Sequence, residues 1–140
     1  MNCELCHGAG GRLLWQNGLA RVVAVDEPGL PGFLRVIAAR HVREMTDLPP
    51  EECTRLLVLV LAVERHLRAA LQPDKMNLAS LGNVTPHVHW HVIPRWRDDR
   101  HFPGPVWAPA RHDGPVPPAR EAAAREMERT LPAALAAFEG

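Results

Sequence analysis

The sequence predicts a single α+β domain, residues 1–140, in which helices pack on one side of a mostly antiparallel sheet. Two observations carry this prediction. Strand-like runs and helical runs follow in the order strand, strand, strand, helix, strand, strand, irregular segment, helix, which is typical of the α+β class. The chain of 140 residues is 46% apolar, which suffices for one buried core.

The first strands are predicted at residues 12–15 and 19–26, joined as a hairpin. Asn17-Gly18 between them is a strong turn signal. A third strand is expected at residues 33–38, after a segment rich in proline and glycine.

The clearest helix is predicted at residues 50–71. Prolines and two glutamates stand at its start, where proline is tolerated and acids suit the helix dipole. Apolar residues recur at helical spacing and form one stripe: Leu56, Val60, Val63, Leu67 and Leu71.

Strands are expected next at residues 75–81 and 87–93. Residues 96–118 are rich in proline, glycine, tryptophan and charge without periodicity, which predicts a long irregular segment. Residues 117–139 are alanine-rich and predict a C-terminal helix, which Pro132 should interrupt.

The composition argues against several classes of protein. Sixteen basic residues balance sixteen acidic ones, so charge indicates neither a nucleic-acid nor a membrane partner. The longest apolar stretch, residues 56–63, is too short to cross a bilayer, and no signal peptide is visible. Three cysteines suit a reducing compartment better than a disulfide scaffold, so we expect a cytoplasmic protein.

The most informative feature is the alternation of histidine with apolar residues from His87 through His89 to His91. On a strand the three imidazoles share one face, and Val88 and Trp90 point to the other, where Trp90 is expected to pack in the core. Histidine titrates near neutrality, so a neutral imidazole can attack phosphorus and form a covalent intermediate.

Two other interpretations of the three histidines remain. One is a solvent-facing strand that merely happens to use histidine. The other is a zinc site made of all three, although ligands at alternate positions lie about 7 Å apart along a strand. Only some such rows can converge on one ion.

Cys3 and Cys6 form a Cys-x-x-Cys pair, which can supply half of a tetrahedral zinc site. The alternative is a free thiol pair on a mobile terminus; a redox role is disfavoured because no βαβ pattern follows. His7 is a weaker spare ligand, and Cys53 is expected to be a packed thiol.

Residues 87–93 resemble the signature of the histidine triad (HIT) family, His-φ-His-φ-His-φ-φ with φ apolar, at every position. The order of predicted elements extends the resemblance over residues 3–107. The resemblance implies a five-stranded antiparallel sheet, a homodimer, and hydrolase or transferase chemistry at the α-phosphate of a nucleotide.

By position, the resemblance makes His89 the nucleophile that takes up the nucleotidyl group. It implies that His91 contacts the phosphate and assists the leaving group, and that His87 supports the nucleophile. Asn83 follows Gly82 where many relatives have glutamine after glycine, which makes it a candidate phosphate contact with a shorter reach. Asn77 is a further candidate, after a one-residue shift of the alignment.

The remaining substrate contacts each have a second interpretation. Asp26 is placed to hold the ribose hydroxyls, but it is also an ordinary residue for ending a strand. Arg95 can reach a phosphate or pair with an acid. Trp107 can close over the nucleotide or pack in a dimer interface, and burial of some kind is expected. His66, His101 and His112 are expected to be surface histidines.

Some proteins of this family bind zinc through a Cys-x-x-Cys pair, a histidine after the third strand and the first histidine of the triad. The resemblance therefore implies a structural zinc site made of Cys3, Cys6, His41 and His87, without an open position for chemistry.

The leading hypothesis is a nucleotide hydrolase or nucleotidyl transferase that acts on a dinucleoside polyphosphate. The phosphoramidate-hydrolysing branch commonly has serine where this chain has Val84, which disfavours but retains that alternative. A slow or inactive nucleotide-binding regulatory protein, and a protein in which the triad only binds metal, are further alternatives.

Overall fold

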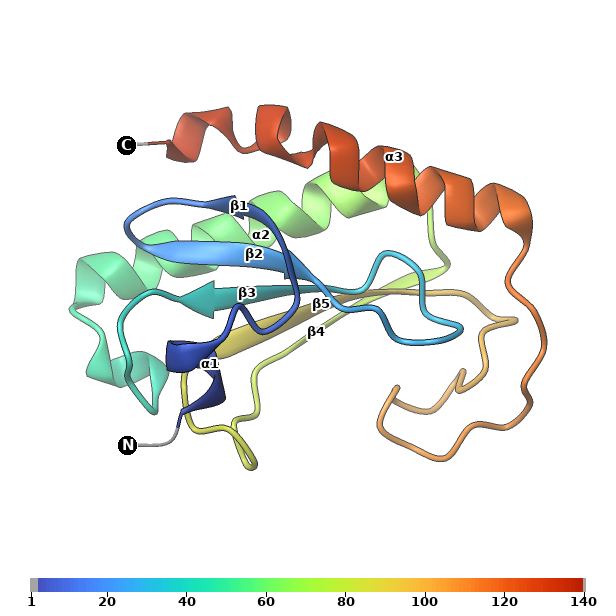
Figure 1. Cartoon of the computed structure of the whole chain (residues 1–140), viewed down its shortest axis with the longest axis horizontal. Helices are drawn as coiled ribbons and strands as arrows, with labels where there is room; N and C mark the ends of the chain where they lie inside the picture. The colour runs from blue at the N-terminus through green and yellow to red at the C-terminus, as the bar shows by residue number, and fades with distance from the viewer. Residues whose placement is uncertain (1–2, 140) are drawn as a thin grey trace.

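The computed structural model describes residues 3–139, and it confirms the predicted α+β fold. The elements, in chain order, are α1 (Glu4–His7), β1 (Arg12–Gln16), β2 (Ala20–Ala24), β3 (Leu34–Ala38), the 3-10 helix η1 (Met45–Asp47), α2 (Pro50–Leu71), β4 (Lys75–Ala79), β5 (His89–Arg95), α3 (Pro118–Ala134) and the 3-10 helix η2 (Ala136–Phe138). Figure 1 shows them in place.

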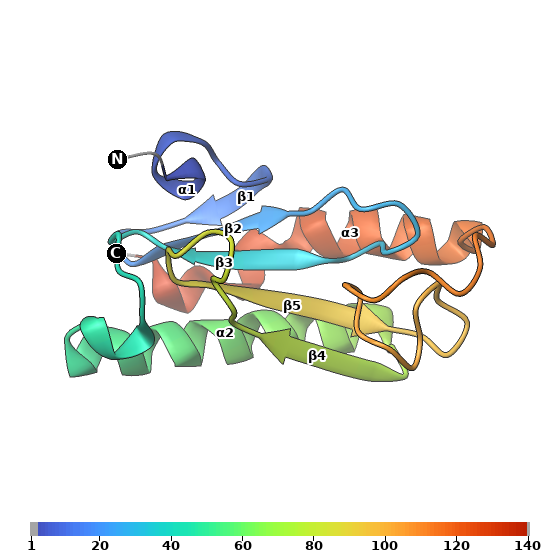
Figure 2. The ribbon, with the colours of Figure 1, turned by 90° about the horizontal axis from the view of Figure 1, so that it is seen from below.

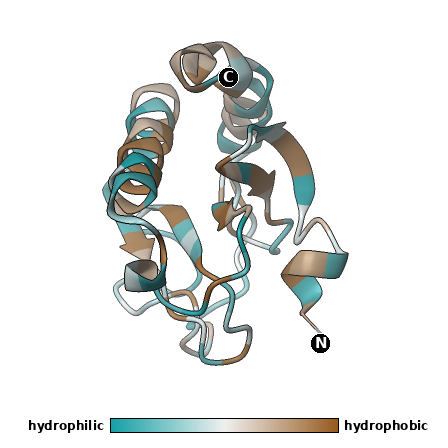
Figure 3. Ribbon diagram, turned by 90° about the vertical axis from the view of Figure 1, so that its left-hand side faces the viewer, coloured by the Kyte–Doolittle hydropathy of each residue, from teal (hydrophilic) through white to brown (hydrophobic). Residues whose placement is uncertain are grey.

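The five strands form one sheet in the order β1-β2-β3-β5-β4, and every neighbouring pair is antiparallel. The strand that carries the histidines, β5, therefore lies inside the sheet, between β3 and β4. Both long helices, α2 and α3, cover one face, whereas the short α1 lies against the other (Figures 2 and 3). We call the face that carries α1 the open face.

The main core lies between the sheet and the two long helices. Alternation from Val88 into β5 turns Val88 and Val92 into this core, together with the half-buried Trp90, as predicted for Trp90. The indole Nε1 of Trp90 donates to Sδ of Met45 at 3.3 Å. The histidines between these residues are consequently directed to the open face.

Most elements lie where the sequence predicts them, and α2 has the predicted bounds. In the hairpin turn, the side-chain oxygen of Asn17 accepts hydrogen bonds from the backbone N–H groups of Leu19 and Ala20. Pro132 lies inside α3, which ends two residues later at Ala134. Along residues 3–139, no helix combines the length and apolar character that a membrane crossing needs.

One boundary differs from the prediction in a way that matters for the site. The strand β5 begins at His89, so His87 precedes the strand. The backbone N–H of Val88 bonds to the carbonyl of Val42, and the Ala38 N–H bonds to the carbonyl of Val88. The chain is thus fixed at this point by Ala38, the last residue of β3, and by Val42 beyond it, which places His87 beside the end of that strand.

Candidate active site and metal centre

The imidazoles of His89 and His91 lie next to each other on the open face, with ring centroids 5.0 Å apart. The Nδ1–H of His89 donates to the backbone carbonyl of His87 at 2.6 Å, because a carbonyl oxygen can only accept. This bond fixes the tautomer of a neutral His89, so that its Nε2 carries the lone pair. The geometry suits a nucleophilic nitrogen.

Burial keeps both imidazoles neutral. It lowers the pKa of His89, and it lowers the pKa of His91 to about 4, where the positive charge of Arg35 acts in the same direction. Both side chains are buried in the folded chain. At neutral pH the pair therefore offers uncharged nitrogen atoms.

We expect the depressed pKa of His91 to make the fold sensitive to acid. An unfolded histidine takes up a proton near pH 6.5, whereas folded His91 does so only near its pKa of about 4. The unfolded state therefore binds more protons between these values, and the free energy of unfolding should fall as pH is lowered through this window, by at most about 3 kcal/mol.

Urea denaturation between about pH 7 and about pH 4 measures this effect. The variant His91→Asn should lose stability less steeply than the wild type as pH falls. The metal-ligand residues are present in both proteins, so their contribution cancels in the comparison. If the free energy of unfolding fell equally steeply with falling pH in both proteins, folding would not lower the pKa of His91.

Two aromatic rings flank His91. Phe33 meets its imidazole edge to face at 5.7 Å between centroids, and Trp107 does so at 5.2 Å. Trp107 is 52% exposed, so the expected burial is not found in the single chain. The Nδ1 of His91 is buried and has no hydrogen-bond partner within residues 3–139. The site thus contains a polar atom without a partner and a partly exposed indole beside it.

Arg95 pairs with an acid, the second of the two interpretations made from the sequence. Its Nε donates to Oδ2 of Asp99 at 2.9 Å, and the two side chains are only 2% and 1% exposed. Burial alone would raise the pKa of Asp99, but Arg95 and three backbone N–H groups hold it below its usual range. The Nη1 of Arg95 donates to Oδ1 of Asn77 at 2.8 Å and Nη2 to the Gly104 carbonyl. Arg95 and Asn77 thus anchor the irregular segment that follows β5.

Asp26 and Asn83 are not brought to the triad by direct hydrogen bonds in the described part of the chain. The carboxylate of Asp26 pairs with Arg12 at 2.9 Å, and this contact lowers the pKa of Asp26. Arg12 also bonds to Glu128 of α3 at 2.7 Å. Asn83 lies exposed on the loop that leads from β4 to His87.

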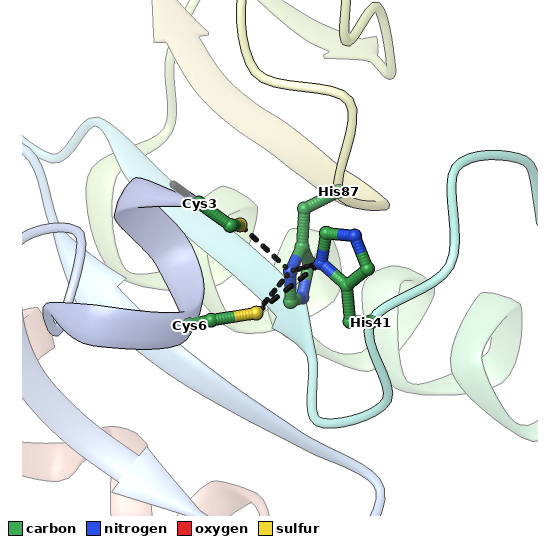
Figure 4. Close-up of side chains that lie close together, drawn as sticks. All are labelled: Cys3, Cys6, His41 and His87. Carbon is green, nitrogen blue, oxygen red and sulfur yellow. Dashed lines mark hydrogen bonds between the residues drawn. The ribbon is translucent and has the colours of Figure 1, made fainter. Parts of the chain in front are cut away.

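Four side chains from three separate parts of the chain converge beside the triad (Figure 4). Cys3 directly precedes α1 and Cys6 lies in it, His41 follows β3, and His87 precedes β5. Their potential ligand atoms all lie within 4.8 Å of one another. These are the four residues that the resemblance implies.

The distances between side-chain atoms in this cluster are close to those between the ligand atoms of a tetrahedral metal ion. The His41 and His87 Nδ1 atoms are 3.1 Å apart, and Sγ of Cys6 lies 3.2 Å from Nδ1 of His41 and 3.5 Å from Nδ1 of His87. Ligand atoms around tetrahedral zinc are about 3.3 to about 3.8 Å apart. The Nε2–H of His87 donates to the Ala38 carbonyl at 2.7 Å, which leaves Nδ1 free to bind. The cluster can therefore hold a metal ion.

Two residues have roles that we did not predict from the sequence. Arg35 of β3 lies on the open face, directly across from His91 in the neighbouring strand. A lone arginine in the apolar run of residues 33–38 was the available signal. His66 is not a simple surface histidine, since its Nε2–H donates to the Met127 carbonyl at 3.0 Å and links α2 to α3.

Comparisons with known proteins agree with this geometry. A family model described as HIT domain matches residues 10–98. A bis(5'-nucleosyl)-tetraphosphatase [asymmetrical] of Schizosaccharomyces pombe is 30% identical over 95 residues, which are 64% of this chain and 52% of that protein. An AP-4-A phosphorylase of Mycobacterium tuberculosis is 31% identical over 81 residues, 54% of this chain and 42% of that protein. The chain spans about half the length of these curated relatives.

Solved structures show the same fold over nearly the whole chain. A histidine triad protein from Marinobacter aquaeolei VT8 has a TM-score of 0.70 and 29% identity, covering 96% of this chain and 92% of that one. A ZN-bound histidine triad family protein from Mycobacterium smegmatis has a TM-score of 0.63 and 24% identity, covering 99% and 96%. Together with the family model, which matches more than half of the sequence, these findings establish that the chain belongs to the HIT domain family.

Proposed function

We propose that the protein is a nucleotide hydrolase or nucleotidyl transferase that acts at the α-phosphate of a dinucleoside polyphosphate. The observation that carries this proposal is the hydrogen bond from Nδ1 of His89 to the His87 carbonyl, which leaves Nε2 as a neutral nucleophile. The names of the relatives from S. pombe and M. tuberculosis support the choice of substrate.

In the proposed reaction, Nε2 of His89 attacks the α-phosphorus and a P–N bond forms. The P–O bond to the rest of the polyphosphate breaks, and the leaving group departs with the bonding electron pair. Water then attacks the same phosphorus and gives up a proton to the bulk solvent, and a nucleoside monophosphate is released as the P–N bond returns its electrons to His89. We assign His91 to hydrogen bonding with the phosphoryl oxygens and the leaving group, and His87 to the orientation of His89.

Among the remaining candidates, Trp107 and Asn83 are proposed as direct substrate contacts. Trp107 lies against His91 and can pack on a bound nucleotide. Asp26 can hold the ribose only after its carboxylate leaves Arg12. We assign Arg95 and Asn77 an indirect role, since they hold the segment that presents Trp107.

We further propose that the metal is zinc and that it is structural. Two sulfur and two imidazole ligands are typical of zinc, and four protein ligands leave no open position for chemistry. The zinc-bound relative from M. smegmatis supports this choice. Bound zinc would join α1 to the end of β3 and to His87. The described cysteines form no disulfide, which suits the reducing cytoplasm.

The test of the proposed function is release of nucleoside monophosphate from a panel of dinucleoside polyphosphates, nucleotidyl sulfates and nucleoside phosphoramidates. We expect the wild type to prefer a dinucleoside polyphosphate. Preference for a phosphoramidate would assign the chain to the alternative branch. Nucleotide binding without turnover of any substrate would contradict an enzymatic function and favour a regulatory protein.

We also propose that the protein is a homodimer that uses α2 and β4. The strand β4 is an edge of the sheet, and unpaired edges favour association. Beside it, α2 exposes Leu57, Val58 and Leu61, which are 40%, 49% and 47% accessible in the single chain. An apolar surface of this kind, next to an open strand edge, indicates an interface.

The variant Leu61→Glu is expected to turn the dimer into a monomer, because it buries a charge in the proposed interface. Sedimentation velocity measures the mass of both proteins. Ala122→Glu, on the exposed side of α3, is the matched control and should leave the dimer intact. A monomeric wild type, or a dimer that tolerates Leu61→Glu, would contradict the proposed interface.

A further inference from the structure

Arg35 is the one strongly polar side chain that β3 places on the open face beside the triad. Its cross-strand partners are His91 on one side and Val23 on the other. Residues directly opposite each other in an antiparallel pair point to the same face and lie within side-chain contact. Arg35 is thus a neighbour of His91 by the register of the sheet.

The guanidinium of Arg35 has few hydrogen-bond partners for its N–H groups. Its Nη1 donates to the Gly10 carbonyl at 2.8 Å, whereas its Nε is buried and has no partner. Within residues 3–139, no carboxylate lies close enough to form an ion pair with it. Burial lowers the pKa of Arg35, and Glu4 opposes this only through its electrostatic field. A half-buried cation without a counter-ion costs free energy unless a ligand compensates for it.

Arg21 shows what an arginine with a purely structural role looks like on the same face. Its Nε donates to the Ala9 carbonyl at 2.9 Å, and its Nη2 donates to the carbonyls of Leu5 at 2.7 Å and Gly8 at 2.9 Å. Arg21 therefore holds α1 and the segment that follows it through Nε and Nη2. Arg35 has one bond to the same segment, so tethering does not account for its remaining donors.

A second polar atom without a partner lies on the neighbouring strand. The Nδ1 of His91 is buried and unbonded, like Nε of Arg35. The charge of Arg35 also reaches His89 and His91, where it acts to lower the pKa of both imidazoles. A group with several acceptor oxygens, bound beside these two side chains, would accept hydrogen bonds from guanidinium N–H groups that the described chain leaves unbonded, and it would neutralise the cation.

We propose that Arg35 is a substrate-binding residue that contacts phosphate oxygens of the nucleotide next to His89. This proposal rests on the proposed function only in assuming that a nucleotide phosphate binds at His89. A cation at this point favours substrates whose reacting end carries several phosphate charges. It therefore favours a polyphosphate leaving group over a neutral amine.

The test compares the binding of adenosine monophosphate and adenosine to the metal-loaded 140-residue chain by calorimetry. Neither probe has a leaving group, so binding is measured without turnover. Arg35→Gln should weaken binding of the monophosphate about tenfold to about a hundredfold, as expected for hydrogen bonds to a charged group. It should leave adenosine binding unchanged. Arg35→Lys keeps the charge and should retain part of the difference.

Arg21→Gln is the matched control for tethering, and metal content and thermal stability are recorded for every variant. Arg21→Gln should keep the preference for the monophosphate over adenosine. Equal weakening of both probes by Arg35→Gln would assign Arg35 to the nucleoside and overturn the proposal. The proposal would also be overturned if Arg35→Gln bound the monophosphate as tightly as the wild type does. The same holds if Arg21→Gln lost as much affinity for the monophosphate as Arg35→Gln, or if the wild type did not bind the monophosphate.

These outcomes are separate from those of the proposed function. A protein that releases no product from the whole panel, yet loses its preference for the monophosphate in Arg35→Gln, would refute the enzyme and keep the phosphate contact. A protein that hydrolyses a dinucleoside polyphosphate equally well with Arg35 or Gln at this position would keep the enzyme and refute the contact.

Discussion

His89→Asn should lower kcat by at least about 10³-fold with the preferred dinucleoside polyphosphate, because no other group replaces the nucleophile. Asparagine is chosen because it removes the nucleophile and keeps a hydrogen-bond donor. Its side-chain NH₂ can take the place of Nδ1–H in the bond to the His87 carbonyl, which measures 2.6 Å in the wild type. The local backbone is thereby supported while the nucleophilic Nε2 is removed.

The covalent step can be observed directly. Rapid mixing of wild-type protein with substrate, followed by denaturation and mass spectrometry, should detect protein that carries one nucleotidyl group. His89→Asn should show no such adduct. His112→Asn, an exposed histidine of the irregular segment, is the control and should keep both the adduct and the rate. Turnover within about tenfold of the wild type in His89→Asn would rule out covalent catalysis at this residue.

The sequence predicts the elements with strong periodicity and misses features that depend on tertiary contacts. The helix α2 is predicted to the residue because its apolar stripe, prolines and acids agree. The four-residue α1 is too short to show a period. His87 belongs to the predicted strand by alternation alone. In the structure the backbone of Val88 bonds to Ala38 at the end of β3 and to Val42 beyond it, and β5 begins only at His89.

The candidate site, too, can be predicted from the sequence only in part. Alternation alone places His89 and His91 on one face. The metal cluster needs the family resemblance, because Cys3 and His87 are 84 residues apart in sequence. Which partner a charged residue takes cannot be read from the sequence: Arg95 pairs with Asp99 inside an irregular segment, and Arg35 reaches the triad only through the register of two strands.

Cys6→Ser should abolish stoichiometric zinc binding and lower the melting temperature by about 10 °C. Serine removes the sulfur that lies 3.2 Å from Nδ1 of His41 and 3.5 Å from Nδ1 of His87, and it cannot replace a thiolate as a ligand. Metal analysis and calorimetry of the purified protein measure the two effects. Cys53→Ser, on α2, should keep the zinc content and lower the melting temperature much less, since Cys53 lies outside the cluster and is only partly buried.

The metal is also expected to act on catalysis through His87. The residue whose Nδ1 faces the thiols is the same residue whose carbonyl accepts the Nδ1–H of His89. Loss of the metal removes one restraint on the His87 side chain, whose bond to the Ala38 carbonyl remains, and so weakens the restraint on the tautomer of His89. In Cys6→Ser, kcat should therefore fall while Cys53→Ser keeps the wild-type rate. A metal-free Cys6→Ser protein with wild-type stability and wild-type kcat would show that the cluster neither holds the fold together nor positions His89.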